Sequence, residues 1–443
     1  MKKIIGFYLL FCFALSLSAQ PWMNNIPADK RGETPKFYDI QSAFNDYWEG
    51  KEIEKGKGWK QFKRWEEFME ARVYPSGELN YKAIRTEMFN ARSGNKTTAG
   101  NWSHLGPDDT PTDINYGYRR GVGRVNCIAF HPTDDNIMYV GAPSGGLWIT
   151  TDSGNSWSTT TDELPSMGIS DIAIHPDDPS IIYIATGDGD ASDTYSVGIM
   201  KSEDGGQTFT STSFSSTVDY GLVIRRILIN PQNPQIMLIA TSNGIFRSTD
   251  DGITWGSVQT GHFKDMEFKP GDPTVVYAAK FGYYGNADIY KSTDGGASFS
   301  AITPAGLDIS EVDRIEMAVT PANASCLYAV CSRSDNDGFH SLFKSTDEGQ
   351  TWTKTIDSTT VNLLGWSSDG SDSGGQGWYD LAIAASPSDE NELYIGGVNT
   401  WKSTDGGLTF DLNSHWYGDG GVAYVHADQH MLIFNENTGN LFS

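Results

Sequence analysis

Short apolar segments alternate with polar turns along most of the chain. From Trp102 onward, pairs of apolar segments are joined by Pro-led turns, as in IAFHPTDDNIMYVGA and IAIHPDDPSIIYIAT. Apolar runs of strand length that are bounded by turn residues are typical of buried strands. Each pair is therefore expected to form the two inner strands of one sheet.

The paired segments recur at a regular interval, and each pair is followed by an octapeptide of the pattern S/T-x-D-x-G-x-x-W/F. Six octapeptides occur, and their aspartates are 44–58 residues apart. A period of about 40–50 residues is typical of one four-stranded propeller blade. The predicted fold is an all-β, multi-bladed β-propeller with about seven blades, the last of which starts at QHMLIFNENTGNLF and is incomplete at Ser443. The aspartates and glycines of the octapeptides are Asp152, Gly154, Asp204, Gly206, Asp250, Gly252, Asp294, Gly296, Asp347, Gly349, Asp405 and Gly407.

Each part of the octapeptide has a mechanical explanation. The aspartate is expected to accept hydrogen bonds from following N–H groups, and the glycine allows a tight turn. The octapeptides resemble Asp-box (BNR) repeats, which occur in bacterial sialidases, xyloglucanase-type glycoside hydrolases and sortilin-type sorting receptors. The resemblance implies that these turns are structural hairpins at the blade periphery, away from any ligand.

The N-terminal hundred residues differ from this pattern. Residues 1–19 combine two lysines, an apolar run and small residues, which predicts a signal peptide and export to the medium or the cell surface. Residues 20–100 contain apolar positions at helical spacing between Phe37 and Asn90, so we expect one or two helices and a polar linker. These helices form either a pro-segment or docking arm, or an amphipathic segment packed on the main domain. The propeller is expected over residues 101–443.

Composition narrows the classes of partner. The formal net charge of −24 disfavours nucleic acid and anionic membranes as partners. The sequence has no second apolar segment long enough to predict a membrane span. Outside the signal peptide, Cys127, Cys326 and Cys331 have no disulfide-framework spacing, so we expect buried thiols. No cofactor is required by any motif.

Three families with such repeats imply different functions. The segment GYRRGVGRVNCIAF lacks the Phe/Tyr-Arg-Ile-Pro element of sialidases. The segment NIMYVGAPSGGLWITTD is similar to the first blade of xyloglucanase-type hydrolases, but their catalytic Asp falls at Pro143, which has no proton to exchange. The segments GWYDLAIAASPSDENELYIGGVNTWKSTDGG and VHADQHMLIF resemble sortilin-type propellers of exported bacterial proteins. We therefore favour a binding module for a protein, peptide or polysaccharide; a xyloglucanase-type glycoside hydrolase and a purely structural surface role are the alternatives.

Two short constellations could hold a metal. In GDGDASDTY, Asp188, Asp190 and Asp193 provide oxygen ligands that could hold calcium, although an ordinary Asp/Gly turn explains them as well. In HADQH, His426, Asp428 and His430 alternate, so on a strand they would share one face and bind a transition metal or a polar ligand. A hydrogen-bonded polar cluster at the channel is the alternative.

The third constellation is the leading candidate surface. In DSGGQGWYDLA a Gly-rich loop leads into Trp378, Tyr379 and Asp380. Aromatic faces beside a carboxylate are frequent in sugar and peptide sites, and the loops at one end of a propeller carry most of its binding. Ordinary loop packing is the alternative.

Overall fold

The computed structural model describes residues 21–27, 35–53, 57–79, 123–191, 193–282, 286–302 and 304–443. The chain divides into two compact units, Met1–His104 and Leu105–Ser443. The predicted signal peptide and polar linker lie outside the described residues. Within the described ranges, no helix has the length and apolar character needed to cross a membrane.

The smaller unit is a helical hairpin with its own aromatic core. It contains the 3₁₀ helix η1 (Pro21–Asn25) and the α-helices α2 (Phe37–Trp48) and α3 (Trp59–Val73). The rings of Phe44 and Phe62 stack with centroids 3.7 Å apart, and Trp22 meets Phe44 edge-on at 4.9 Å. The predicted helical segment is confirmed, with two α-helices whose apolar faces are buried against each other.

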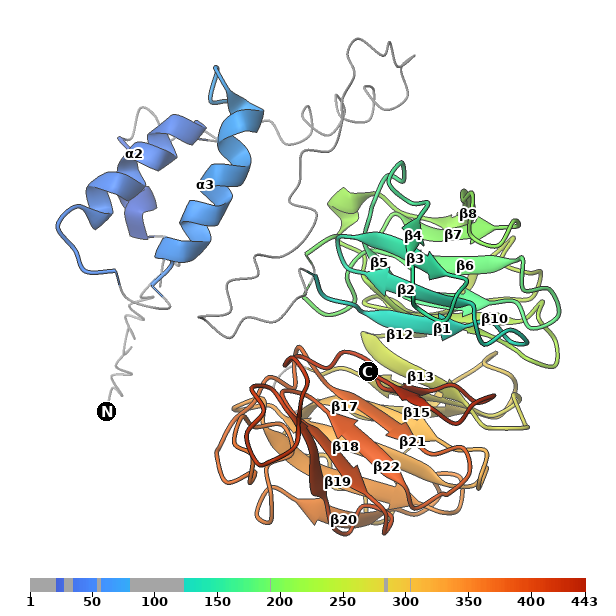
Figure 1. Ribbon diagram of the computed structural model, residues 1–443. Helices are drawn as coiled ribbons and strands as arrows, with labels where there is room; N and C mark the ends of the chain where they lie inside the picture. Colours follow the sequence, from blue (N-terminus) through green and yellow to red (C-terminus); the bar gives the residue numbers. More distant parts are fainter. Residues whose placement is uncertain are drawn as a thin grey trace, which may run out of the picture. The chain divides into compact units, whose positions relative to one another are not determined.

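The larger unit is a β-propeller, as predicted (Figure 1). In its described residues, six sheets contain four successive antiparallel strands each, and the sixth sheet adds a short parallel strand, β25. The 3₁₀ helix η3 (Val218–Tyr220) precedes the third sheet. The strands, sheet by sheet, are β1 (Cys127–Phe130), β2 (Met138–Ala142), β3 (Gly146–Thr150), β4 (Ser158–Thr159); β5 (Ile169–Ile174), β6 (Ile182–Thr186), β7 (Gly198–Ser202), β8 (Thr210–Ser215); β9 (Ile224–Ile229), β10 (Met237–Thr241), β11 (Gly244–Ser248), β12 (Gly256–Thr260); β13 (Phe263–Phe268), β14 (Val276–Lys280), β15 (Asp288–Ser292), β16 (Ser300–Ala301); β17 (Val312–Val319), β18 (Leu327–Arg333), β19 (Phe339–Ser345), β20 (Thr353–Asp357); β21 (Ala382–Ala385), β22 (Leu393–Gly396), β23 (Thr400–Ser403), β24 (Asp411–His415) and β25 (Ala423–Tyr424).

A hairpin of β26 (Ile433–Phe434) and β27 (Leu441–Phe442) joins the sixth sheet to the first. Strand β26 lies beside β21, and the ring of Phe442 is 4.8 Å from that of Phe130. The side-chain amide of Asn437 donates to the carbonyl of Pro132 at 3.3 Å. The predicted seventh blade is thus present as two strands that contact the first blade.

The apolar segments predicted as inner strands pack between neighbouring blades. The second strands β6 and β10 are buried at every position. The thiols of Cys127, Cys326 and Cys331 are free and buried, and burial raises their pKa values. These contacts between blades, rather than any disulfide, stabilise the ring.

The six octapeptides form the same turn. In each, the aspartate accepts a hydrogen bond from the hydroxyl two residues before it, and from the N–H and hydroxyl four residues after it. In the second octapeptide, for example, the hydrogen bonds to Asp204, first among them that from the Thr208 hydroxyl, lower the pKa of Asp204 to about 2. The glycines have φ between 76° and 88°, which side-chain-bearing residues resist. The carboxylates are thereby engaged within their own turns.

One octapeptide glycine should be far less tolerant of alanine than a turn glycine in another octapeptide. A Cβ at Gly407 (φ 86°) would lie 2.4 Å from Cδ2 of Leu342, whereas a Cβ at Gly205 (φ 71°) meets nothing within 4 Å. Both variants carry the left-handed strain of about 1 kcal/mol, but only Gly407→Ala must also displace a packed side chain, at a further cost of about 1–3 kcal/mol. Urea unfolding of the two variants measures this difference, and equal losses would contradict the described packing.

A β-bulge recurs at the beginning of four innermost strands. In β5, β9, β13 and β17 the pairing with the next strand skips one residue, namely Ser170, Arg225, Lys264 and Asp313 respectively. A bulge changes the direction of consecutive side chains. As a result, both Arg225 and Arg226 line the axial cavity, although strict alternation would send one of them into a blade interface.

Candidate functional site

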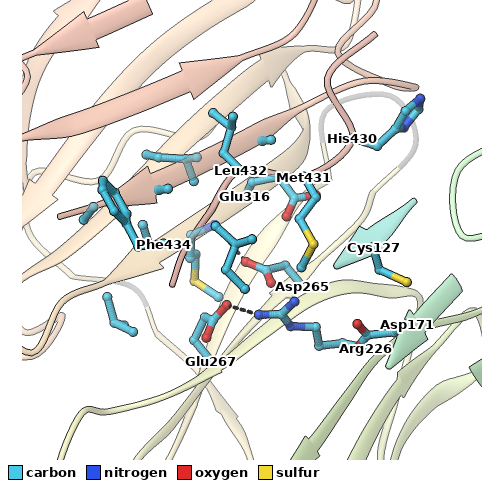
Figure 2. Close-up of a pocket in the computed structure, with 18 of the residues that line it drawn as sticks. Cys127, Asp171, Arg226, Asp265, Glu267, Glu316, His430, Met431, Leu432 and Phe434 are labelled. Carbon is cyan, nitrogen blue, oxygen red and sulfur yellow. Dashed lines mark hydrogen bonds and ion pairs between the residues drawn. The ribbon is translucent and has the colours of Figure 1, made fainter. Parts of the chain in front are cut away.

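The three predicted loop constellations meet at one end of the propeller axis. They lie in residues 187–197, 358–381 and 416–432, and we call the surface that these loops form the loop face. The loop face opens onto an axial cavity of about 520 Å³. Figure 2 shows Arg226, Asp265, Glu267 and Glu316 in this cavity, with His430 at its edge.

Asp190 connects the loop face to the inner strands of two other blades. Its carboxylate accepts from Arg225 Nη1 at 3.0 Å, lies 3.3 Å from Arg314 Nη2, and lies 3.0 Å from His430 Nδ1. Burial alone would raise the pKa of Asp190, but Arg314, His430 and Arg225 outweigh burial and lower it well below its ordinary value. Asp190 is therefore ionised and fixed.

The loop before β21 is held by cations from two other blades. Arg314, from β17, donates through Nη1 to the carbonyls of Trp378 and Tyr379 at 3.1 and 2.9 Å. Lys264, from β13, donates to the Trp378 carbonyl at 2.8 Å. The Gly-rich sequence before Trp378 lets the backbone approach the axis, and the two cations then fix the turn.

Asp380, at the end of this turn, is a buried carboxyl group. The residue is 1% exposed, and neither carboxyl oxygen has a hydrogen-bond partner among the described residues. Burial, followed by repulsion from Asp428, raises its pKa to about 8 against the opposing effect of Arg314. Asp428 is partly exposed and accepts from Gln376 Nε2 at 3.0 Å. The loop face therefore covers a carboxyl group that is protonated at neutral pH and that lies close enough to Asp428 to be repelled by it.

The raised pKa of Asp380 has a consequence for stability. Because the unfolded value is near 3.9, the folded chain binds more protons than the unfolded chain between about pH 4 and pH 8. The contribution of Asp380 to stability is fully present below about pH 4 and is lost as the pH rises through about 8. We expect Asp380→Asn to unfold like the wild type at pH 4 and to be more stable at pH 9, by about 3–5 kcal/mol.

Thermal unfolding between pH 4 and pH 9 measures this difference. Asp193→Asn is the matched control, because its side chain is 63% exposed on the same face. A pH dependence of Asp380→Asn that parallels the wild type would contradict the assigned pKa.

Aromatic rings border the two carboxyl groups. Trp378 is 47% exposed, and its ring centroid lies 5.4 Å from that of Tyr379. Tyr379 meets the ring of His430 edge-on at 4.6 Å, and the guanidinium of Arg124 lies over its face at 5.2 Å. Tyr379 is thus fixed, while Trp378 presents an open face to solvent, suitable for stacking on a sugar ring.

The residues of HADQH do not lie on a strand, so the expectation that all three share one face is wrong. Asp428 has a left-handed φ of 71°, and Gln429 donates its N–H to the Gly397 carbonyl, which turns the segment into a loop. His430 enters the cavity, whereas His426 is exposed. The structure favours a hydrogen-bonded polar cluster at the channel.

The loop containing Asp188 and Asp193 is organised by its own hydrogen bonds. The Asp188 carboxylate accepts from the N–H groups of Asp190, Ala191 and Asp193 at 3.0–3.1 Å, and from Arg124 at 2.5 Å. No group of three or more His, Cys, Asp or Glu residues within the described ranges is placed to hold a metal ion. Calcium stays a prediction that none of these contacts requires.

Sequence reasoning missed Arg225, Lys264 and Arg314 as site residues. The signal was present as polar doublets inside otherwise apolar segments, in VIRRILIN, HFKDMEFK and EVDRIEMAV. Two consecutive charged residues are rare on a buried strand. Here the β-bulge changes the direction of one of them, so that its side chain lines the cavity.

Comparisons with known proteins place this geometry in context. No protein-family model matches the chain. The chain is 26% identical over 349 residues to the xyloglucanase Xgh74A of Acetivibrio thermocellus, covering 67% of this chain and 39% of the relative. It is 27% identical over 217 residues to a xyloglucanase of Paenibacillus sp, covering 41% and 21%. The chain thus spans about two fifths of the length of the first relative.

Solved structures give the same fold. The GH74 xyloglucanase of Xanthomonas campestris aligns with a TM-score of 0.53 at 17% identity, covering 72% of this chain and 50% of that one. The GH74 enzyme of Niastella koreensis aligns with a TM-score of 0.52 at 21% identity and the same coverage.

The expectation of a noncatalytic, sortilin-like binding module is contradicted by these comparisons. The curated relatives are xyloglucanases, which favours the alternative of a glycoside hydrolase. Pro143 excludes an acid only at its own position. The carbonyl of Pro143 accepts from the Thr194 hydroxyl at 2.7 Å, so this residue has a structural role. Carboxyl groups of the loop face come instead from Asp380 and Asp428.

Proposed function

We propose that this chain is an exported glycoside hydrolase that cleaves xyloglucan at the loop face of its propeller. The similarity to curated xyloglucanases supports the reaction class and the substrate. The observation that carries the assignment to this face is the pair Asp380 and Asp428, one held protonated and the other partly exposed. Carboxyl groups with different environments are the usual means of glycoside hydrolysis.

In this proposal Asp380 is the general acid. Its pKa of about 8 keeps a proton available at neutral pH for the leaving glycosidic oxygen. Asp428 supplies the second carboxylate, which activates a water molecule or stabilises the positive charge that develops on the sugar. Trp378 provides a face for a glucose ring, and Arg314 fixes the turn that carries the acid. Because Asp380 is buried, the bound polysaccharide must displace the Trp378–Tyr379 turn to reach it.

Release of reducing ends from xyloglucan by the purified chain tests this proposal. We expect hydrolysis near neutral pH and a loss of rate as the pH rises past about 8, since Asp380 then loses its proton. The Asp380→Asn variant, purified in the same way, is the control for contaminating enzyme. Absence of release above this control, in a sample shown to be folded by circular dichroism, would contradict the proposal.

A further inference from the structure

The mouth of the axial cavity has more positive than negative charge. Arg225, Lys264 and Arg314 line it, and their side chains are almost fully buried. Facing them are Asp190 and Glu316. The pKa of Glu316 is raised to about 7 by burial, so this group is only partly ionised at neutral pH. Arg225 and Arg314 alone therefore outweigh Asp190 and the partly ionised Glu316, so a small positive excess remains at the mouth.

Burial and the positive charge at the mouth lower the pKa values of two neighbouring groups. The pKa of His262 is lowered to about 3, first by burial and then by Arg225, Lys264 and Arg314. The pKa of Lys264 itself is lowered by burial and by the same two arginines. Positively charged groups that repel one another in a buried site are stabilised when an anion binds among them.

The mouth also holds polar nitrogens with nothing to bind. Arg225 Nε and His430 Nε2 are buried and have no hydrogen-bond partner among the described residues. The exposed fraction of the side chain is 7% for Arg225 and 1% for His430, and both residues line the cavity. The Arg225 Nε is a buried N–H without a partner, which costs about 1–3 kcal/mol that a ligand oxygen recovers. His430 turns its Nδ1 to Asp190, so its Nε2 is free to accept from a ligand hydroxyl.

We propose that the mouth of the cavity is a carboxylate-binding subsite that takes the acid group of a uronic acid residue through Arg225 and Lys264, while His430 Nε2 accepts from a sugar hydroxyl. A single negative charge matches the small positive excess, whereas the nearby Asp190 and Asp428 disfavour a dianion such as phosphate. The cavity of about 520 Å³ is large enough for a sugar ring. The choice of a sugar as the carrier rests on the proposed function, but binding does not require hydrolysis.

Isothermal titration of the full chain with sodium glucuronate tests this inference, with glucose as the neutral counterpart and acetate as the small carboxylate. We expect saturable binding of glucuronate and none of glucose. Arg225→Gln is expected to weaken glucuronate binding by about tenfold or more, as for the loss of one charge-assisted hydrogen bond. Arg226→Gln is the matched control, because this adjacent arginine pairs with Glu267 at 2.6 Å. The affinity of this variant for glucuronate should stay within about twofold of the wild-type value. Lys264→Met gives a second test if Arg225→Gln does not fold.

The possible results separate this inference from the proposed function. Equal binding of glucose and glucuronate, or equal effects of Arg225→Gln and Arg226→Gln, would overturn the subsite. Acetate binding as tightly as glucuronate would overturn the assignment to a sugar acid. Hydrolysis of neutral xyloglucan without glucuronate binding would contradict the subsite alone, whereas glucuronate binding without hydrolysis would contradict the proposed function alone.

Discussion

Replacing Arg314 by Gln is expected to lower the free energy of unfolding by about 3–5 kcal/mol, as is typical when one partner of a buried ion pair is removed. Arg314 is 3% exposed and lies 2.8 Å from Glu316 and 3.3 Å from Asp190. The variant leaves these two carboxylates with fewer partners, and it frees the backbone carbonyls of Trp378 and Tyr379.

Urea unfolding measures this loss, and Arg333→Gln is the matched control. Arg333 pairs with Asp335 at 2.8 Å, but both side chains are exposed to solvent, so its replacement should cost less than about 1 kcal/mol. Because Arg314 fixes the turn that carries Asp380, Arg314→Gln should also lose hydrolysis. Similar stability losses in the two variants would show that Arg314 does not organise the loop face.

Under the proposed function, replacing Asp380 by Asn is expected to lower kcat on xyloglucan by about 10²–10⁴-fold, the usual contribution of a general acid. The variant removes the proton donor while it keeps the shape of the side chain. Asp428→Asn should cause a loss in the same range, because it removes the second carboxylate.

The stability and activity of Asp380→Asn are expected to change in opposite directions. A buried carboxyl group without a hydrogen-bond partner destabilises the folded chain at high pH, so its removal stabilises the protein while it abolishes catalysis. Asp193→Asn, on the same face, should leave both kcat and stability unchanged within about twofold and about 0.5 kcal/mol. An Asp380→Asn variant with more than half of the wild-type kcat would exclude Asp380 as the acid.

The fold could be predicted from the sequence because its signals are local and repeated. Each blade contains two apolar strands, a Pro-led turn and an octapeptide such as that around Asp152, and six copies of this pattern leave few other folds. The helices around Phe44 and Phe62 were also predicted, from apolar positions at helical spacing.

The candidate site could be predicted only in part. Trp378, Tyr379 and Asp380 stand in a Gly-rich loop that sequence reasoning singled out, and the structure brings them beside Asp190 and His430. That proximity depends on residues far apart in the chain, which no local pattern encodes.

The charge of the loop face was missed for a related reason. Arg225 and Lys264 point into the cavity because β-bulges interrupt the alternation of their strands. A pattern of period two assumes that consecutive side chains point to opposite faces of the sheet, and this assumption fails at a bulge.

A crystal structure of the Asp380→Asn variant with a xyloglucan oligosaccharide is the sharpest test of the proposal that xyloglucan is cleaved at the loop face with Asp380 as the acid. We expect a sugar ring to stack on Trp378 and a glycosidic oxygen to lie within about 2.6–3.2 Å of the side chain at position 380. We also expect displacement of the Trp378–Tyr379 turn. An oligosaccharide bound elsewhere, for example on the octapeptide turns, or one that leaves position 380 buried beneath an unmoved turn, would contradict cleavage at the loop face.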